Sequence, residues 1–247
     1  MTEANVHLQD NEIWLSTGDC LIHFYEKGSS RRGASLRVSL ADIESSDCRP
    51  FLNMYPIELL DPALQPPHQP DRASRFSNYF DDLSICPQYE LFIPAPTHLP
   101  KDEALQYHLT TRNFFAWMYN RPLVGDRLGQ AFIRLQARMD QYRQNTKNNE
   151  NELLAYLEDQ GYLDFRHCPD HALAVLQYAE HHQMRDLWTD AFVHCSGMHD
   201  ELDASCEFEV CGPDASSLQS FANIHAECLT SYSSANNSSS YRNGYPS

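Results

Sequence analysis

Histidine and cysteine, the side chains most often used for nucleophilic catalysis and metal binding, gather at two places in the second half of the chain. At the first place, His167, Cys168 and His171 surround Pro169. A cysteine next to a histidine is the arrangement of a thiolate nucleophile and its general base. The same residues are explained more simply by a loop that ends where a helix begins, because proline is favoured in the first helical turn.

The second place offers five possible ligands for zinc, which in tetrahedral sites accepts two histidines and two cysteines. The five are His194, Cys195, His199, Cys206 and Cys211. Adjacent residues on a helix point about 100° apart, and the spacings match no common zinc motif. We therefore expect a core cysteine with solvated histidines, and no bound metal or cofactor. A metal-binding protein or a Cys/His-dependent enzyme that uses either place is the alternative hypothesis.

A glycine-rich segment at residues 28–35 has the frame of a phosphate-binding loop. Ala34 stands where that loop requires a lysine to contact the β- and γ-phosphates. A strand-like run follows, instead of the helix N-terminus that phosphate binding needs. We expect the loop of a β-hairpin here, and none of the three motifs supplies a catalytic residue.

Composition and charge exclude broad classes of function. The chain has 247 residues, of which 42% are hydrophobic, and a formal net charge of −16. A strongly acidic protein is repelled by nucleic acids and by anionic membranes, which are polyanions. The first residues lack the basic and apolar regions of a secretory signal, and no apolar run approaches the roughly 20 residues that span a bilayer. We expect an intracellular protein of the cytoplasm or nucleus that binds neither nucleic acid nor membrane.

Charge is distributed unevenly along the chain. Residues 112–147 contain seven basic and two acidic residues, whereas residues 150–210 contain fourteen carboxylates and two arginines. Intramolecular complementarity or solvated faces explain this pattern. A basic helix that forms a binding site is the alternative.

The first half of the chain predicts a small sheet with a short helix. Alternating apolar residues predict strands at residues 20–24, 36–40 and 89–93. The first two flank the glycine-rich loop and are typical of a β-hairpin. A short helix is expected after them, ending near Pro50. Residues 56–88 are rich in proline and indicate a linker or an insertion.

The second half predicts mostly helices, because its apolar residues recur at helical spacing. The expected helices cover residues 102–118, 128–142, 153–161, 169–179 and 187–197. The last two are close enough in sequence to form a helical hairpin. From residue 212 the chain is rich in serine and asparagine and cannot bury much apolar surface, so we expect a disordered tail over residues 212–247.

This order of elements resembles the BTB/POZ fold, in which two strands, a short helix and a third strand precede several helices. The similar runs are residues 38–47, 51–55, 110–123 and 172–187, the last of which resembles the final helical hairpin of a BTB domain. The resemblance implies an α+β fold with a small BTB-like core of sheet and helices. The domain would cover residues 14–209 and be interrupted by the insertion at about 56–88.

A fungal family of unknown function is a closer resemblance. The runs that carry it are residues 16–20, 28–33, 108–117, 161–164 and 169–176. It covers residues 14–209, and the run HLTTRNFFAW at 108–117 is the most specific. The family has no established activity. Its members continue as helix where this chain becomes rich in serine, which suggests a truncated or altered C-terminus.

We predict a non-enzymatic protein–protein interaction module, either an adaptor or a self-association domain of the BTB type. The expected partner is another protein or a second copy of the chain. BTB domains bind cullin-type ligase scaffolds or transcriptional partners, so the resemblance implies such a partner by analogy of fold. The resemblance also implies that the contact residues lie around Phe51, Met54, Tyr55 and Tyr119.

Overall fold

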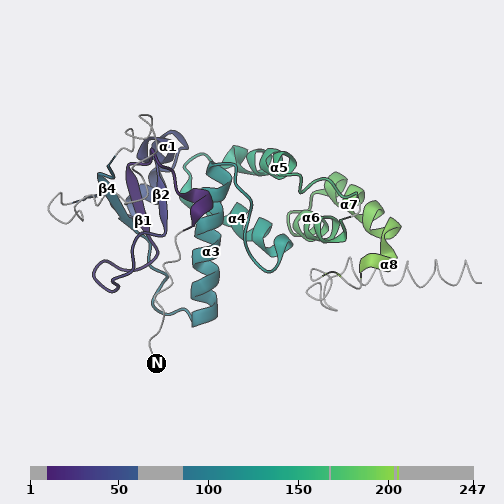
Figure 1. Cartoon of the computed structure of the whole chain (residues 1–247). Helices are drawn as coiled ribbons and strands as arrows, with labels where there is room; N and C mark the ends of the chain where they lie inside the picture. Colours follow the sequence, from purple (N-terminus) through teal and green to yellow (C-terminus); the bar gives the residue numbers. More distant parts are fainter. Residues whose placement is uncertain (1–9, 61–85, 167, 203–204, 206–247) are drawn as a thin grey trace, which may run out of the picture. The chain divides into compact units, whose positions relative to one another are not determined.

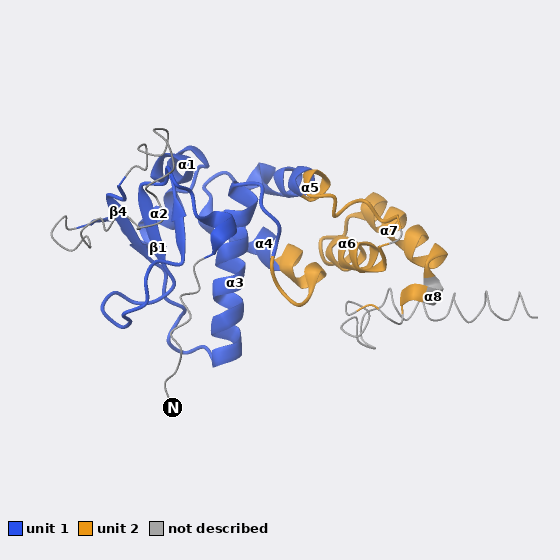
Figure 2. Ribbon diagram, viewed as in Figure 1, with its two compact units in different colours: residues 1–123, 134–156 blue, residues 124–133, 157–247 orange. Residues whose placement is uncertain are grey.

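The computed structural model describes residues 10–60, 86–166, 168–202 and 205 (Figure 1). It is a mixed α+β structure, as the sequence predicts. The chain forms two compact units (Figure 2). Unit 1 comprises residues 1–123 and 134–156, and unit 2 comprises residues 124–133 and 157–247.

A four-stranded sheet belongs to unit 1, with the strand order β2-β1-β4-β3. The strands are β1 (Cys20–His23), β2 (Leu36–Val38), β3 (Glu58–Leu59) and β4 (Tyr89–Phe92). β1 and β2 form the predicted antiparallel hairpin, and β4 is the predicted third strand, which runs parallel to β1. Ile22 stands opposite both Leu36 and Leu91, and all three side chains are fully buried. The alternation of apolar residues thus places one face of the sheet on the core.

Two short helices connect β2 to β3, where the sequence predicts one. α1 (Leu40–Ser45) begins at Ser39, whose hydroxyl accepts a backbone hydrogen bond and caps the first turn. The helix ends well before Pro50, and Asp47 follows with a left-handed φ of 57°. Pro50 instead lies in the first turn of α2 (Arg49–Met54). The prediction that the short helix stops near Pro50 is wrong: the first turn of a helix needs no N–H from this residue, so Pro50 lies at the start of a second helix.

The helix α3 (Lys101–Met118) is buried all round over its second half. Residues 110–116 are all buried, whereas a helix that faced the core on one side would bury about half of them. The hydroxyls of Thr110 and Thr111 donate to carbonyls one turn earlier in the same helix, so these polar side chains are satisfied without water. Complete burial explains why the specific run at 108–117 mixes polar and aromatic residues.

An aromatic cluster joins α2, α3 and α4 (Leu128–Tyr142) within unit 1. The ring centroid of Phe51 lies 4.8 Å from that of Tyr142 and 5.9 Å from that of Phe115. Phe114 lies 5.1 Å from Tyr142 on the other side. All four rings are fully buried. Aromatic pairs at these separations each contribute about 0.5–1.5 kcal/mol beyond the area they bury, so the cluster holds the three helices together.

Arg112 places a positive charge in the middle of α3, where it is only 5% exposed. Its Nε donates to Asp10 Oδ2 at 2.6 Å, and its Nη2 donates to Glu12 Oε2 at 2.6 Å. Its Nη1 donates to the backbone carbonyl of Pro122. A buried guanidinium costs several kcal/mol to desolvate unless its donors are satisfied. This charge therefore fixes both the N-terminal segment, with the 3₁₀ helix η1 (Asn11–Ile13), and the loop after α3.

Arg143 is a second buried arginine, and it joins α4 to α5 (Asn149–Asp159). Its Nη1 donates to Asn149 Oδ1 at 2.6 Å and lies 2.6 Å from Glu152 Oε2. The guanidinium also lies 4.9 Å from the ring centroid of Trp117 on α3. The 3₁₀ helix η4 (Thr146–Asn148) leads directly into α5.

Unit 2 is helical in its described residues. Its complete helices are α6 (Pro169–His181), α7 (Arg185–Gly197) and α8 (His199–Leu202). α6 and α7 pack against each other as the predicted hairpin, and proline occupies the first turn of α6 as expected. Gly161, just after α5, has the positive φ of 76° that ends a helix readily.

The start of α4 belongs to unit 2, and there Gly129 lies very close to the backbone of α6 in the same unit. A Cβ atom at Gly129 would lie 3.1 Å from both the Cα and the carbonyl oxygen of Ala174. Phe132, one turn later, is fully buried, with its ring centroid 6.2 Å from that of Tyr178. The absence of a side chain at Gly129 allows this close packing of two helices.

Two predicted segments fall largely outside the description. Most of the insertion at 56–88 and the whole tail at 212–247 lie outside the described residues. Within the part of the chain that is described, no helix combines the length and apolar character needed to cross a membrane.

Gly129→Ala is expected to lower the free energy of unfolding by about 1–3 kcal/mol, because the added methyl group has no room against α6. Gly197→Ala is the matched control, since a Cβ there meets nothing within 4 Å. Urea denaturation followed by circular dichroism measures both. Equal stabilities of the two variants would contradict the close packing at Gly129.

Arg112→Met is expected to lower the free energy of unfolding by about 1–3 kcal/mol, since it leaves charged partners without their donor. Combining it with Asp10→Asn and Glu12→Gln should restore part of this loss, because the unpaired carboxylates are then removed. The exposed Arg121→Met serves as the control. Failure of the triple variant to recover any stability would contradict the ion-pair account.

Candidate functional site

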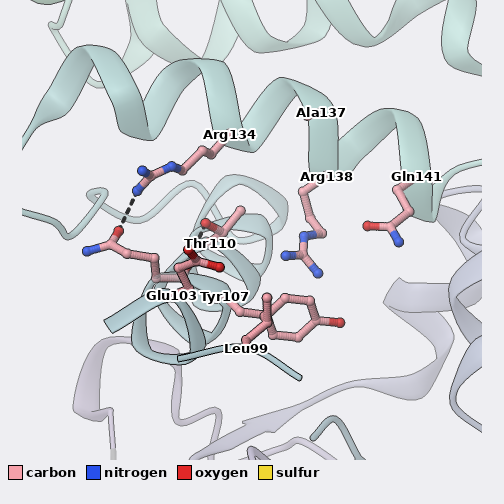
Figure 3. A pocket seen from close by; sticks show the side chains of 9 residues that line it. Leu99, Glu103, Tyr107, Thr110, Arg134, Ala137, Arg138 and Gln141 are labelled. Carbon is pink, nitrogen blue, oxygen red and sulfur yellow. Dashed lines mark hydrogen bonds between the residues drawn. The ribbon is translucent and has the colours of Figure 1, made fainter. Parts of the chain in front are cut away.

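An open groove of about 340 Å³ lies between α3 and α4 in unit 1 (Figure 3). Its lining consists of Leu99, Glu103, Gln106, Tyr107, Thr110, Arg134, Ala137, Arg138 and Gln141. The lining residues of each helix are three or four positions apart, so they share one helix face. Arg134 Nη1 donates to Gln106 Oε1 at 2.5 Å and thereby joins the two walls.

Two arginines of α4 give the groove its positive charge. Figure 3 shows Arg134 and Arg138 extending from α4 toward the side chains of α3. Arg138 is only 7% exposed; its Nη1 donates to Tyr142 Oη at 2.7 Å, and its guanidinium lies 4.2 Å from the ring centroid of Tyr107. Neither arginine forms an ion pair with a carboxylate among the residues described. Glu103 is the acidic residue of the lining.

Tyrosine hydroxyls form a hydrogen-bonded group beside Arg138. Tyr55 Oη and Tyr107 Oη are 2.5 Å apart. Burial raises the pKa of Tyr55, and its hydrogen bond to Tyr107 raises it further. Burial alone would also raise the pKa of Tyr107, but hydrogen bonds from Tyr55 and Tyr142 and the charge of Arg138 lower it. The two hydroxyls therefore share one hydrogen bond, which holds the rings of Tyr55 and Tyr107 together beside Arg138.

Two of the four predicted contact residues lie at the edge of this groove. Met54 is 40% exposed, and its Sδ lies 4.0 Å from Nε2 of Gln141. Tyr55 reaches the groove through its hydroxyl contact with Tyr107. The groove lining together with Met54 and Tyr55 forms a candidate docking surface, called the docking surface below.

The other two predicted contact residues, Phe51 and Tyr119, make contacts within the fold. Phe51 is fully buried in the aromatic cluster, so its side chain contributes packing. Tyr119, which is half-buried at the end of α3, accepts a hydrogen bond from the Ser39 backbone N–H at 3.1 Å. Burial raises the pKa of Tyr119 above its ordinary value. This hydrogen bond joins the end of α3 to the start of α1.

The first histidine–cysteine group is described in part. His167 lies outside the described residues. Cys168 is the residue that precedes α6, and it is half-buried. His171 Nδ1 lies 3.4 Å from the carbonyl oxygen of Asp164, and its ring centroid lies 5.4 Å from that of Tyr162. These contacts belong to the packing at the start of α6.

The second group is also described in part. Cys195 is fully buried on α7, as predicted for a core cysteine, and the ring of His194 packs on Phe165 with centroids 5.2 Å apart. The side chain of His199 and residues Cys206 and Cys211 lie outside the description. In the remaining residues, no group of three or more His, Cys, Asp or Glu is placed to hold a metal ion.

The sequence gives no sign of a histidine–carboxylate pair on the sheet. His23 Nε2 lies 3.2 Å from Glu90 Oε1, and His23 Nδ1 lies 2.9 Å from Tyr25 Oη. The ring also stacks on Phe92 at 4.6 Å between centroids. Burial lowers the pKa of His23, although the charge of Glu90 acts in the opposite direction. Both ring nitrogens have partners within unit 1, so the pair serves the packing of the sheet.

Comparisons with known proteins assign no activity. Residues 150–233 match the sequence model of a domain of unknown function, DUF8004. The resemblance to an uncharacterised domain family is thus confirmed for this part of the chain. The match includes α6 and α7, whereas α3 and the specific run at 108–117 lie outside it. No curated protein and no solved structure matches the chain.

His108, next to Tyr107 on α3, couples the stability of unit 1 to pH. Its ring lies 5.3 Å from that of Phe24, and its buried Nδ1 has no hydrogen-bond partner in the described structure. Burial, and then the positive charge of Arg138, lower its pKa. As the pH falls, His108 is therefore protonated in the unfolded chain before it is protonated in the folded chain. The free energy of unfolding decreases as the pH drops below the ordinary histidine pKa of about 6.5.

The melting temperature is accordingly expected to fall between about pH 7.5 and 5.5, in the range where unfolded histidine becomes protonated. The fall should be smaller in His108→Phe, which keeps an aromatic ring against Phe24 and cannot be protonated. Differential scanning fluorimetry measures the shift, and His98→Phe, at an exposed position, is the control. An identical pH response of His108→Phe and the wild-type chain would show that His108 carries no such coupling.

Proposed function

We propose that unit 1 is a non-enzymatic protein–protein interaction module and that the docking surface between α3 and α4 contacts the partner. The observation that carries this proposal is the composition of the docking surface. It presents Met54 of α2, Tyr107 of α3, and Arg134 and Arg138 of α4. Tyrosine, methionine and arginine are enriched in the centres of protein interfaces, and tyrosine and arginine among the residues that dominate binding energy.

The docking surface is also held in place before any partner binds. Arg138 is fixed by Tyr142 and by the ring of Tyr107, while Tyr107 is fixed in turn by Tyr55. Ordering a flexible side chain at an interface costs about 0.5–1.5 kcal/mol, so side chains that are already ordered favour binding. Both walls are regular helices, which position side chains more accurately than loops.

The order of elements supports an adaptor or self-association domain of the BTB/POZ type. A β-hairpin, short helices and a strand parallel to β1 precede the long helices, which is close to the order that the resemblance implies. On that analogy the partner is a protein such as a cullin-type scaffold, or a second copy of the chain. The analogy concerns the fold, and the docking surface supplies the specific argument for binding.

The test compares two exposed apolar residues, one on the docking surface and one on unit 2. Met54→Asp and Val193→Asp each place a carboxylate at an exposed position, with Val193 61% exposed on α7. Tagged full-length chains are purified from the protein's own cells and quantified by mass spectrometry, and light scattering measures self-association. Met54→Asp should reduce a specific partner or the dimer about tenfold or more, since an interface hot spot contributes at least about 2 kcal/mol.

Val193→Asp should leave the same partner or dimer unchanged. Circular dichroism confirms that both variants are folded. Recovery of the same proteins at the same abundance from both variants, with no change in oligomeric state, would contradict the assignment of the docking surface.

A further inference from the structure

Three arginines of unit 1 are buried, and Arg138 differs from the other two in its partners. Arg112 and Arg143 each pair with carboxylates of unit 1. Arg138 is buried to a similar degree, but its contacts are the hydroxyl of Tyr142 and the faces of two tyrosine rings. Within the described ranges no carboxylate pairs with it. A desolvated guanidinium without a counter-charge is unfavourable, so this position on the groove is suited to an anion supplied from outside.

Arg134 extends the positive charge by one helical turn. Four residues on a helix correspond to about 6 Å along its axis. In an extended peptide, side chains on one face are two residues apart, or about 6.5–7 Å. Two carboxylates at alternate positions of an extended peptide therefore match the spacing of Arg134 and Arg138. A guanidinium has five N–H donors, which leaves capacity beyond the bonds that each arginine makes within the groove.

Apolar surface flanks the two arginines. Leu99 and Ala137 line the same groove, and the exposed Met54 lies at its edge beside Gln141. A ligand that combines carboxylates with an apolar side chain would use both kinds of surface. The net charge of −16 on the whole chain repels an acidic ligand at a distance, but salt screens charges beyond about 8–10 Å, so the local arginines decide the contact.

We propose that the docking surface binds an extended acidic peptide of a partner protein. Aspartate or glutamate at alternate positions would pair with Arg134 and Arg138, and an apolar side chain would lie against Leu99. This inference rests on the proposed function and adds the chemistry of the ligand.

The test is selection of random 12-residue peptides displayed on phage against the immobilised full-length chain. The most enriched peptide is synthesised with a fluorescein label, and its Kd is measured by fluorescence polarisation. The selected peptides should carry acidic residues at alternate positions. Arg134→Glu and Arg138→Gln should each raise the Kd about tenfold or more, because a hydrogen bond to a charged group contributes about 1.5–3 kcal/mol.

Two further variants separate a specific site from a general effect of charge. Arg49→Glu makes the same change in net charge as Arg134→Glu at an exposed position on α2, so it should leave the Kd unchanged. Glu103→Gln removes the groove's own carboxylate and should tighten binding about twofold, as expected for one partly exposed charge pair. Arg134 is exposed, so its variant tests the proposal even if Arg138→Gln unfolds the chain.

Several outcomes would overturn the proposal. These are the failure of any peptide to be enriched, the enrichment of peptides without acidic residues, and equal affinity across all variants. Binding more than a hundredfold tighter after phosphoserine replaces an acidic residue would assign the site to a phosphorylated ligand instead. If Met54→Asp still loses a partner in cells while the selected peptides are not acidic, the interaction function stands and only the acidic ligand fails.

Discussion

The desolvation of arginine is the constraint on which unit 1 depends. Arg112 lies in the half of α3 that is buried all round, so its donors must be satisfied by the protein. Asp10 and Glu12 come from a segment about a hundred residues earlier in the chain, and the Pro122 carbonyl comes from the loop that follows α3. One buried charge thus fixes the N-terminal segment, the helix and the loop together, and the aromatic cluster packs α2 and α4 against the same helix.

The burial of a third arginine distinguishes the docking surface from the rest of unit 1. Arg143 is satisfied by Asn149 and Glu152, as Arg112 is by its own partners. Arg138 has a comparable burial, yet it faces a groove and is held by tyrosines. Within unit 1, the guanidinium groups of Arg112 and Arg143 pair with the protein's own carboxylates. That of Arg138 lies at the groove in a fixed orientation. On the proposed function, a surface held in this way would bind its partner with little loss of side-chain entropy.

Local periodicity explains which parts of this structure could be predicted. The β-hairpin, the third strand and the helices of the second half follow from spacings of two and of three to four residues, which are visible without tertiary information. The sequence does not separate α1 from α2, because a proline can either begin or interrupt a helix and the turn at Asp47 between them has no strong local signal. The histidine–cysteine groups are close in sequence, but closeness in sequence does not determine whether their side chains converge on one site.

The contacts that define the site depend on pairing between distant segments, and local patterns do not encode it. The pairing of His23 with Glu90 requires the parallel register of β1 and β4, and the ion pairs of Arg112 join residues about a hundred positions apart. The spacing of Arg134 and Arg138 is visible in the sequence, but the two residues line a groove only because α3 lies opposite α4. Met54 and Tyr55 were named from a resemblance, and the structure places them beside that groove.

The most direct test of the docking surface is an NMR titration of the arginine Nε–Hε groups of the full-length chain with the selected acidic peptide. Arginine-to-lysine variants assign the individual resonances. The account predicts that the signals of Arg134 and Arg138 shift together as the peptide binds, while those of Arg112 and Arg143 stay in place because their partners lie within unit 1. Binding that leaves Arg134 and Arg138 unshifted would contradict it.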